Sequence, residues 1–177
     1  MVVNIKKITA KLGNSDLTNL INKLNSLKKG LDEADKKIVK DMAEHVEQQT
    51  NNNLASTAYK DGNEDARAYS EIKGKTAKAG MQGSQVLYDE FGTGTEGANS
   101  PHPDKGKFRL NAYNSGKNIQ PDVNGNLYWT YFDKSTNQFV KTQGIPAGKQ
   151  VYDAKESLRK KKKEIIKNRV GEVISKL

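Results

Sequence analysis

The sequence predicts an α+β fold, in which helices at both ends of the chain flank short strands and a long insertion. Three observations lead to this prediction. Apolar residues recur with helical spacing near both termini, and short alternating or aromatic runs lie between them. Glycine and proline are concentrated in the second half of the chain. We expect long N-terminal helices and a C-terminal helix, a small antiparallel sheet, and a long loop with a β-hairpin as an insertion.

The first helical segment is predicted over residues 15–58. Its apolar residues follow one another at steps of three and four, which places them on one face of a helix. Gly30 is a candidate break between a shorter and a longer helix, because glycine costs about 1 kcal/mol relative to alanine there. The polar run at 48–53 is expected to be exposed. The apolar face consists of Leu17, Leu20, Ile21, Leu24, Leu27, Leu31, Ala34, Ile38, Met42 and Val46.

Two short strands are predicted over residues 66–81. Apolar and polar side chains alternate unevenly there, and Lys73-Gly74-Lys75 supplies a turn between the strands. A glycine-marked turn then precedes the segment 86–91. That segment is too short for its period to decide between a single helical turn and a strand.

Residues 95–144 are predicted to form an extended insertion within a single domain that spans 1–177. Frequent glycine and proline exclude a continuous helix from 92–148. Aromatic and β-branched runs around the polar connector 134–137 predict a β-hairpin. The stretch 94–120 has almost no apolar residues to pack, so we expect a mobile loop before assembly.

A last helix is predicted over residues 150–177, and it carries most of the excess positive charge. The whole chain has 30 Lys and Arg against 21 Asp and Glu, and residues 155–177 alone hold nine against three. A basic run in this helix is the candidate contact for DNA or for an acidic partner, unless it is only a solvated face. No helix-turn-helix, zinc-finger or aromatic RNA-binding pattern accompanies it. The run is Arg159, Lys160, Lys161, Lys162 and Lys163.

Composition limits the classes of function. Only 34% of the residues are hydrophobic and 29% are charged, with a mean hydropathy of −0.85, so we expect a modest core. The absence of cysteine excludes disulfides and thiolate metal sites, and two histidines are too few for a His-based metal cluster. No apolar run approaches the roughly 18 residues of a membrane span. We therefore expect a soluble protein without a membrane partner.

No catalytic residue, cofactor site or metal site is predicted. Asp89 and Glu90 are adjacent and so point apart on a helix or a strand, which prevents an acid–base pair between them. Gly92-Thr93-Gly94 lacks the third glycine and the lysine of a phosphate loop. His102 lies between two prolines and is expected to be an exposed loop residue. The chain is not expected to be an enzyme; a small hydrolase would need a constellation that the sequence does not contain.

Four aromatic residues of the predicted hairpin are candidates for an interface. A ligand platform would use such residues, but a hairpin with one buried aromatic face explains them as well. Aromatic residues are also enriched at protein interfaces. Interface or core is therefore favoured for Trp129, Tyr131, Phe132 and Phe139.

Two segments that bracket the insertion resemble a known family. The first enters the insertion through a glycine turn, and the second leaves it through a Gly-Pro-Gly turn and begins the last helix. In this order across residues 5–177, they resemble the tail-component family of long-tailed phages, often labelled gene-ten-like, which joins head and tail at the neck. Departures from the family are the run 147–151, where many members carry an aromatic, apolar pair, and the long polar insertion. The matching residues are Tyr88, Glu90, Phe91, Gly92, Thr93, Gly94, Trp129, Thr142, Gly144, Pro146, Tyr152 and Ala154.

The resemblance implies a structural virion protein of the phage neck, made in the host cytoplasm. It implies a homo-oligomeric ring, sixfold, that leaves a channel for DNA. The expected neighbours are the tail terminator, the head-completion or connector proteins and the tail-tube proteins. The turn at 88–94 would shape the subunit, and the arm at 95–144 would reach adjacent rings. The alternative is a basic DNA-binding protein that uses the lysine-rich last helix.

Overall fold

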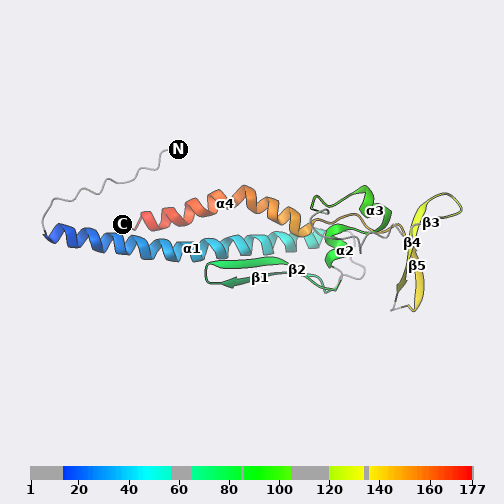
Figure 1. Ribbon diagram of the computed structural model, residues 1–177, viewed down its shortest axis with the longest axis horizontal. Coiled ribbons are helices and arrows are strands. Elements are labelled where there is room, and N and C mark those ends of the chain that lie inside the picture. Colours follow the sequence, from blue (N-terminus) through cyan, green and yellow to red (C-terminus); the bar gives the residue numbers. More distant parts are fainter. Residues whose placement is uncertain (1–13, 57–64, 85, 105–119, 134–135, 177) are drawn as a thin grey trace.

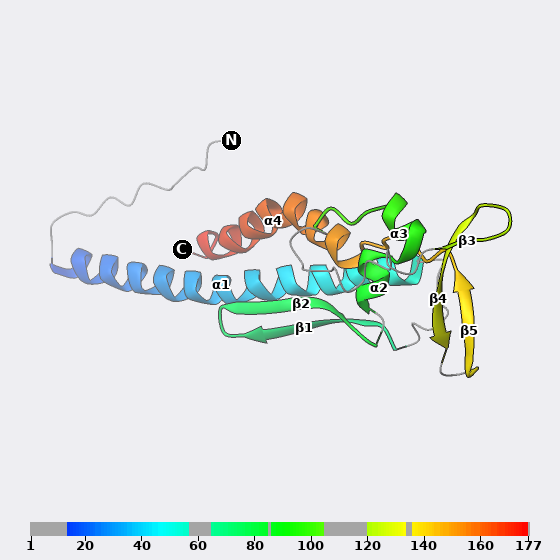
Figure 2. The same ribbon diagram turned by 45° about the vertical axis from the view of Figure 1, so that its right-hand side comes forward.

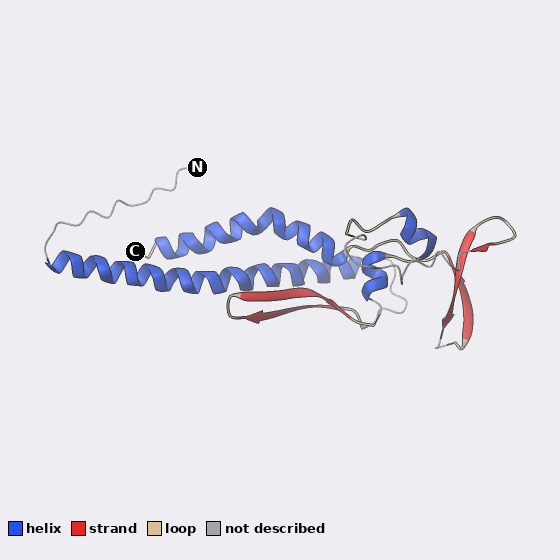
Figure 3. Ribbon diagram, in the orientation of Figure 1, coloured by secondary structure: helices blue, strands red, loops and turns tan. Residues whose placement is uncertain are grey.

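The computed structural model describes residues 14–56, 65–84, 86–104, 120–133 and 136–176. Two long helices lie side by side, a two-stranded hairpin lies along the first of them, and a three-stranded sheet stands at one end (Figure 1, Figure 3). The α+β prediction is confirmed. The elements are α1 (Asn14–Ser56), β1 (Arg67–Lys73), β2 (Thr76–Gln82), α2 (Val86–Phe91), α3 (Gly94–Asn99), β3 (Gln120–Pro121), β4 (Leu127–Asp133), β5 (Gln138–Thr142) and α4 (Gln150–Ile174).

Helix α1 is continuous, so the prediction of a break at Gly30 is wrong. This glycine faces the end of α4. A Cβ atom added to Gly30 would lie 2.7 Å from Cγ1 of Val173. Glycine is therefore present because two helices approach closely, and packing along α1 outweighs its low helix propensity.

Helix α4 packs on α1 through small residues and polar pairs. Ala34 and Ala154 are 3% and 0% exposed. Arg169 donates two hydrogen bonds to Asp41, of 2.6 and 3.0 Å, which is the bidentate geometry that favours an arginine–carboxylate pair. Between its ends α4 arches away from α1 (Figure 1, Figure 2). The residues 159–164, in the middle of the arch, are all exposed.

The predicted pair of strands is confirmed as the antiparallel hairpin β1–β2. It lies along α1, where Ser70 Oγ donates to Glu47 Oε2 at 2.5 Å. The turn of the hairpin is fixed by Lys75, whose Nζ lies 2.8 Å from Asp32 and 3.1 Å from Asp35. The hairpin therefore runs beside α1 as far as the level of these two aspartates.

The second predicted hairpin is also confirmed, as strands β4 and β5, and β3 adds a short third strand. The β4–β5 register runs from Trp129 opposite Thr142 to Asp133 opposite Gln138. This sheet stands at the end of the molecule opposite to the N-terminal end of α1 (Figure 1). Helix α3 lies between it and the helical body.

The buried core is small, and among the described residues it contains as many polar residues as apolar ones. Four of its six apolar members are alanines, which bury little surface each. Large apolar side chains of α1 and of the β3–β4–β5 sheet remain exposed instead. The buried apolar residues are Ala34, Ala43, Val46, Ala68, Phe91 and Ala154. The buried polar residues are Thr50, Asp89, Glu90, Thr93, His102 and Gln150.

Candidate functional site

The two segments that bracket the insertion lie in direct contact. Backbone hydrogen bonds join Gly148 N to the carbonyl oxygen of Asp89 at 2.6 Å and Thr93 N to that of Ile145 at 2.8 Å. The hydroxyl of Thr93 also accepts from Ile145 N at 3.2 Å. The chain thus leaves the helical body and returns to it at one point, and α3 and the β3–β4–β5 sheet belong to the excursion between.

The start of the insertion is a pair of short helices with a tight glycine link. The segment 86–91, for which the sequence allowed a helical turn or a strand, is the helix α2. Residues 94–99 form the helix α3, so the prediction of a mobile loop is wrong for them. Gly92, between them, has φ of +74°, and a Cβ atom there would lie 2.6 Å from Ala147 N. Only glycine combines this left-handed conformation with so close an approach of the returning segment.

Glu90 caps helix α4 from another element. The residue at the N-cap position of α4, Lys149, makes no side-chain hydrogen bond to the helix. Instead, Glu90 Oε2 accepts from Val151 N and Glu90 Oε1 accepts from Tyr152 N, both at 2.9 Å. A carboxylate here satisfies two free N–H groups and opposes the positive end of the helix dipole. The first turn of α4 is therefore tied to α2.

His102 completes this arrangement, and the prediction of an exposed loop histidine is wrong: it is 4% exposed. Asp104 N donates to its Nδ1 at 3.0 Å, so the ring proton lies on Nε2, which donates to Glu90 Oε1 at 3.0 Å. Its ring packs against Phe91 and Tyr152, with centroids 4.3 and 5.1 Å away. The flanking prolines indicated a loop correctly but gave no sign of these partners.

We call Glu90, Phe91, His102 and Tyr152 the Glu90 joint. A salt bridge flanks the joint: Lys155 Nζ lies 2.6 Å from Asp104 Oδ2. The same nitrogen lies 4.4 Å from the centre of the Tyr152 ring. Both nitrogens of the histidine and both oxygens of the glutamate are engaged within the protein. The joint therefore holds three chain segments together.

Asp89 is buried beside the Glu90 joint at 6% exposure. Burial raises the pKa of its carboxyl to about 6. Its Oδ2 has no hydrogen-bond partner among the described residues. Among the residues that the structure describes, no group of three or more His, Asp or Glu residues is arranged to hold a metal ion.

The polar run 48–53 at the end of α1 is exposed only in part. Gln48, Asn51 and Asn52 are exposed as predicted, whereas the other three residues are buried or half-buried. Thr50 is fully buried. Asn51 Oδ1 accepts from Ala68 N at 3.2 Å, and Asn53 Nδ2 donates to the carbonyl oxygen of Gln150 at 2.8 Å. Short polar side chains here hold the hairpin and the start of α4 against α1, a role that periodicity alone does not reveal.

The candidate interface aromatics are on the β4–β5 hairpin, at the far end from the helices. Phe132 and Phe139 form an edge-to-face pair with centroids 5.2 Å apart, yet they remain 45% and 74% exposed. They are therefore not core residues of this chain. Trp129 and Tyr131 pair with Thr142 and Val140 in the ladder, and their side chains lie outside the described part.

The candidate basic contact is on the arch of α4. Arg159 is paired with Glu156 at 2.6 Å. The four lysines 160–163 are exposed, and they form no ion pair within the described residues. Lys161 lies near enough to α1 to add to burial in lowering the pKa of His45. This run of charged residues offers no apolar side chain to pack on α1, and it lies in the part of α4 that arches away from α1 (Figure 1).

Comparisons with the models of known protein families, with curated proteins and with solved structures find no match to this chain. In the part of the chain that the structure describes, no helix is both long and apolar enough to span a bilayer. The family resemblance therefore depends on the residues of the two bracketing segments.

Proposed function

We propose that this protein is a structural virion protein of the phage neck, which completes the tail or joins it to the head. The observation that supports this most is the contact between segments 88–94 and 144–154. Most of the residues that resemble the neck family lie where the excursion leaves and re-enters the helical body. Polar groups of Glu90 and Thr93 make hydrogen bonds across this contact. Such a site is a mechanical joint.

The distribution of exposed apolar residues also supports an assembly role. Phe139 at one end of the molecule and Ile21 at the other are 74% and 56% exposed. Large exposed clusters of aromatic and aliphatic residues are rare on soluble monomers, and they often mark surfaces that contact another protein. A subunit with a thin core and apolar surface at both ends suits a ring whose neighbours lie above, below and beside it.

In the proposed assembly, copies of the chain form a ring at the head–tail interface around the DNA channel. The β3–β4–β5 sheet contacts an adjacent ring, of the tail terminator or of the head-completion proteins. The helices α1 and α4 form the body of each subunit. No reaction is needed for this work; the protein holds the joint between two assemblies.

Electron microscopy of phage particles made without this protein tests the proposal. We expect filled heads and complete tails that fail to join, and joined particles when the wild-type gene is supplied in trans. Normal, infectious virions in the absence of the protein would contradict the proposed function.

The second candidate function is DNA binding by the exposed lysines 160–163. It predicts duplex binding that weakens steeply with salt, with a log–log slope reduced by about 3 to 4 when all four lysines are changed to alanine. A matched variant with alanine at four other exposed lysines should keep the slope. The absence of duplex binding at low salt would exclude this function. The matched positions are Lys23, Lys29, Lys36 and Lys78.

A further inference from the structure

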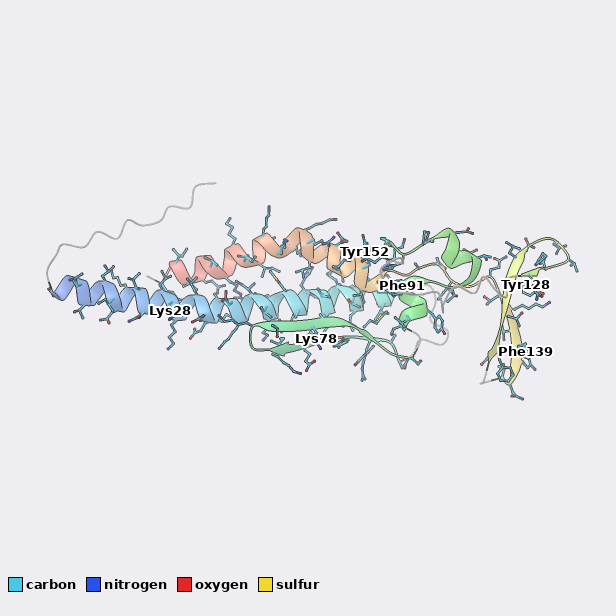
Figure 4. All side chains as sticks on the ribbon, in the orientation of Figure 1. Lys28, Lys78, Phe91, Tyr128, Phe139 and Tyr152 are labelled. Atoms are coloured by element: carbon cyan, nitrogen blue, oxygen red, sulfur yellow. The ribbon has the colours of Figure 1, made fainter. Side chains whose placement is uncertain are left out.

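Helix α1 extends beyond both of the elements that pack on it. The last turn of α4 meets α1 where Val173 faces Gly30. The turn of the β1–β2 hairpin stops at a similar level, where Lys75 binds Asp32 and Asp35. The residues 14–29, which we call the overhang, therefore project past the helical body, and the described elements leave most of their length uncovered (Figure 1, Figure 4).

A leucine occupies every position of a helix-packing seam that runs from the overhang into the next turn of α1. Leu17, Leu20, Leu24, Leu27 and Leu31 follow one another at alternating steps of three and four, which is the a and d spacing of a coiled coil. The same spacing continues to Ala34 and Ile38 in the body of α1, where Ala34 is 3% exposed against α4. The uncovered seam is thus the continuation of one that already packs a helix.

This seam is exposed to a degree that a leucine-rich helix rarely tolerates. Leu17, Leu24 and Leu31 are 42%, 50% and 39% exposed, and Ile21 beside them is 56% exposed. Completing the burial of each would contribute on the order of 1 kcal/mol. Charged residues do not interrupt the a and d positions. A second helix with an apolar face would bury these side chains.

We propose that the overhang packs against the overhang of a second copy of this chain. A seam of leucines at both a and d is self-complementary, and it continues the interface that α1 already makes with α4. The overhang is about two heptads long, so its contact area falls below the roughly 800 Å² per partner of a standard stable interface. The association is therefore weak for a single pair, and it gains strength where several contacts act together in one assembly.

This inference depends on the proposed neck ring only for its biological setting. Its test uses the purified full chain without phage components. A failure of the test would leave the particle assay unaffected, and normal virions without the protein would leave the self-association unaffected.

Sedimentation velocity of the full chain over a wide concentration range tests the contact. The wild type should associate reversibly as concentration rises. The double variant Leu17→Lys, Leu24→Lys should weaken association at least tenfold while its circular dichroism is unchanged, since both residues are half-exposed in the subunit. The control Asn22→Lys, Asn25→Lys adds the same charge on the opposite face of the overhang, and it should associate like the wild type.

Three results would overturn the inference. The wild type could stay monomeric at every concentration, or the leucine variant could associate as tightly as the wild type and thereby assign self-association to another surface. Alternatively, a chain lacking residues 2–12 could associate while the full chain does not. That result would mean that the seam is covered by the N-terminal residues of the same chain.

Discussion

At the residue scale, one glutamate organises the point where the chain leaves and re-enters the helical body. Glu90 accepts two backbone hydrogen bonds from α4 and one from His102. The sequence indicated the importance of this residue through the family resemblance but not its partners, because the N–H groups of Val151 and Tyr152 are 61 and 62 positions away. Such long-range caps are invisible to local capping patterns, which depend on a residue's own neighbours.

Replacing Glu90 should destabilise the fold through loss of this cap. We expect Glu90→Ala to lower the free energy of unfolding by about 2–3 kcal/mol, because buried hydrogen bonds to a charged group are lost and their donors are left unpaired. Glu90→Gln keeps one acceptor and should cost about half as much. Urea denaturation followed by circular dichroism measures both. The control, Glu164→Gln on the exposed arch of α4, should change little; equal effects at the two positions would contradict the capping role.

Asp89 should make the fold less stable as pH rises. Burial raises its pKa to about 6 from 3.8, so between these values the folded state holds a proton that the unfolded state has released. The contribution of Asp89 to stability is therefore greatest below about pH 4, falls as pH rises to 6, and is lower by about 2–3 kcal/mol at neutral pH. Asp89→Asn should remove this decline, as measured by thermal unfolding from pH 4 to 7. Parallel pH profiles for the two proteins would count against it.

At the element scale, the sequence predicts whether a segment is a helix or a strand better than it predicts where each helix begins, breaks or ends. Periodicity identified α1 and α4, since each presents one repeating face over many residues. The two hairpins were indicated instead by uneven alternation or aromatic runs on either side of turn residues. Periodicity missed α3, because six residues rich in glycine show no period. The sequence also predicted a break at Gly30, where close contact with Val173 explains why the residue is glycine. At Gly30 a tertiary contact overrides local preference.

Two glycines in helices test this explanation of Gly30. Gly171 has no atom within 4 Å of an added Cβ, whereas Gly30 has Val173 Cγ1 at 2.7 Å. Gly171→Ala should therefore raise stability by about 0.5–1 kcal/mol through helix propensity. Gly30→Ala should lower the melting temperature, because Val173 must move and the end of α4 is displaced. If both alanine variants were equally stabilised, the close helix contact would not be the reason for the glycine.

At the scale of the whole molecule, a thin core and two exposed apolar ends describe a subunit that is completed by its neighbours. The overhang of α1 and the β3–β4–β5 sheet lie at opposite ends of the body (Figure 2). The single domain with an inserted arm at 95–144 stays a prediction. Sequence could not indicate which aromatics would be exposed, because that depends on what the sheet packs against.

The exposed aromatic pair should matter for assembly more than for folding. Phe139→Ser should change the free energy of unfolding by less than about 1 kcal/mol, because the side chain is 74% exposed. The same variant should restore joined particles poorly when it replaces the wild type in phage. Val123→Ser, at a fully exposed turn residue of the same sheet, should restore them normally. Equal complementation by both variants would remove Phe139 from the interface.

Cryo-electron microscopy of the intact phage neck tests the central claim most directly. The account predicts a ring of several copies of this chain at the head–tail junction, with the α1–α4 bodies around the DNA channel and the β3–β4–β5 sheets against an adjacent ring. A neck map fully explained by other proteins, with no density for this chain at the junction, would contradict it.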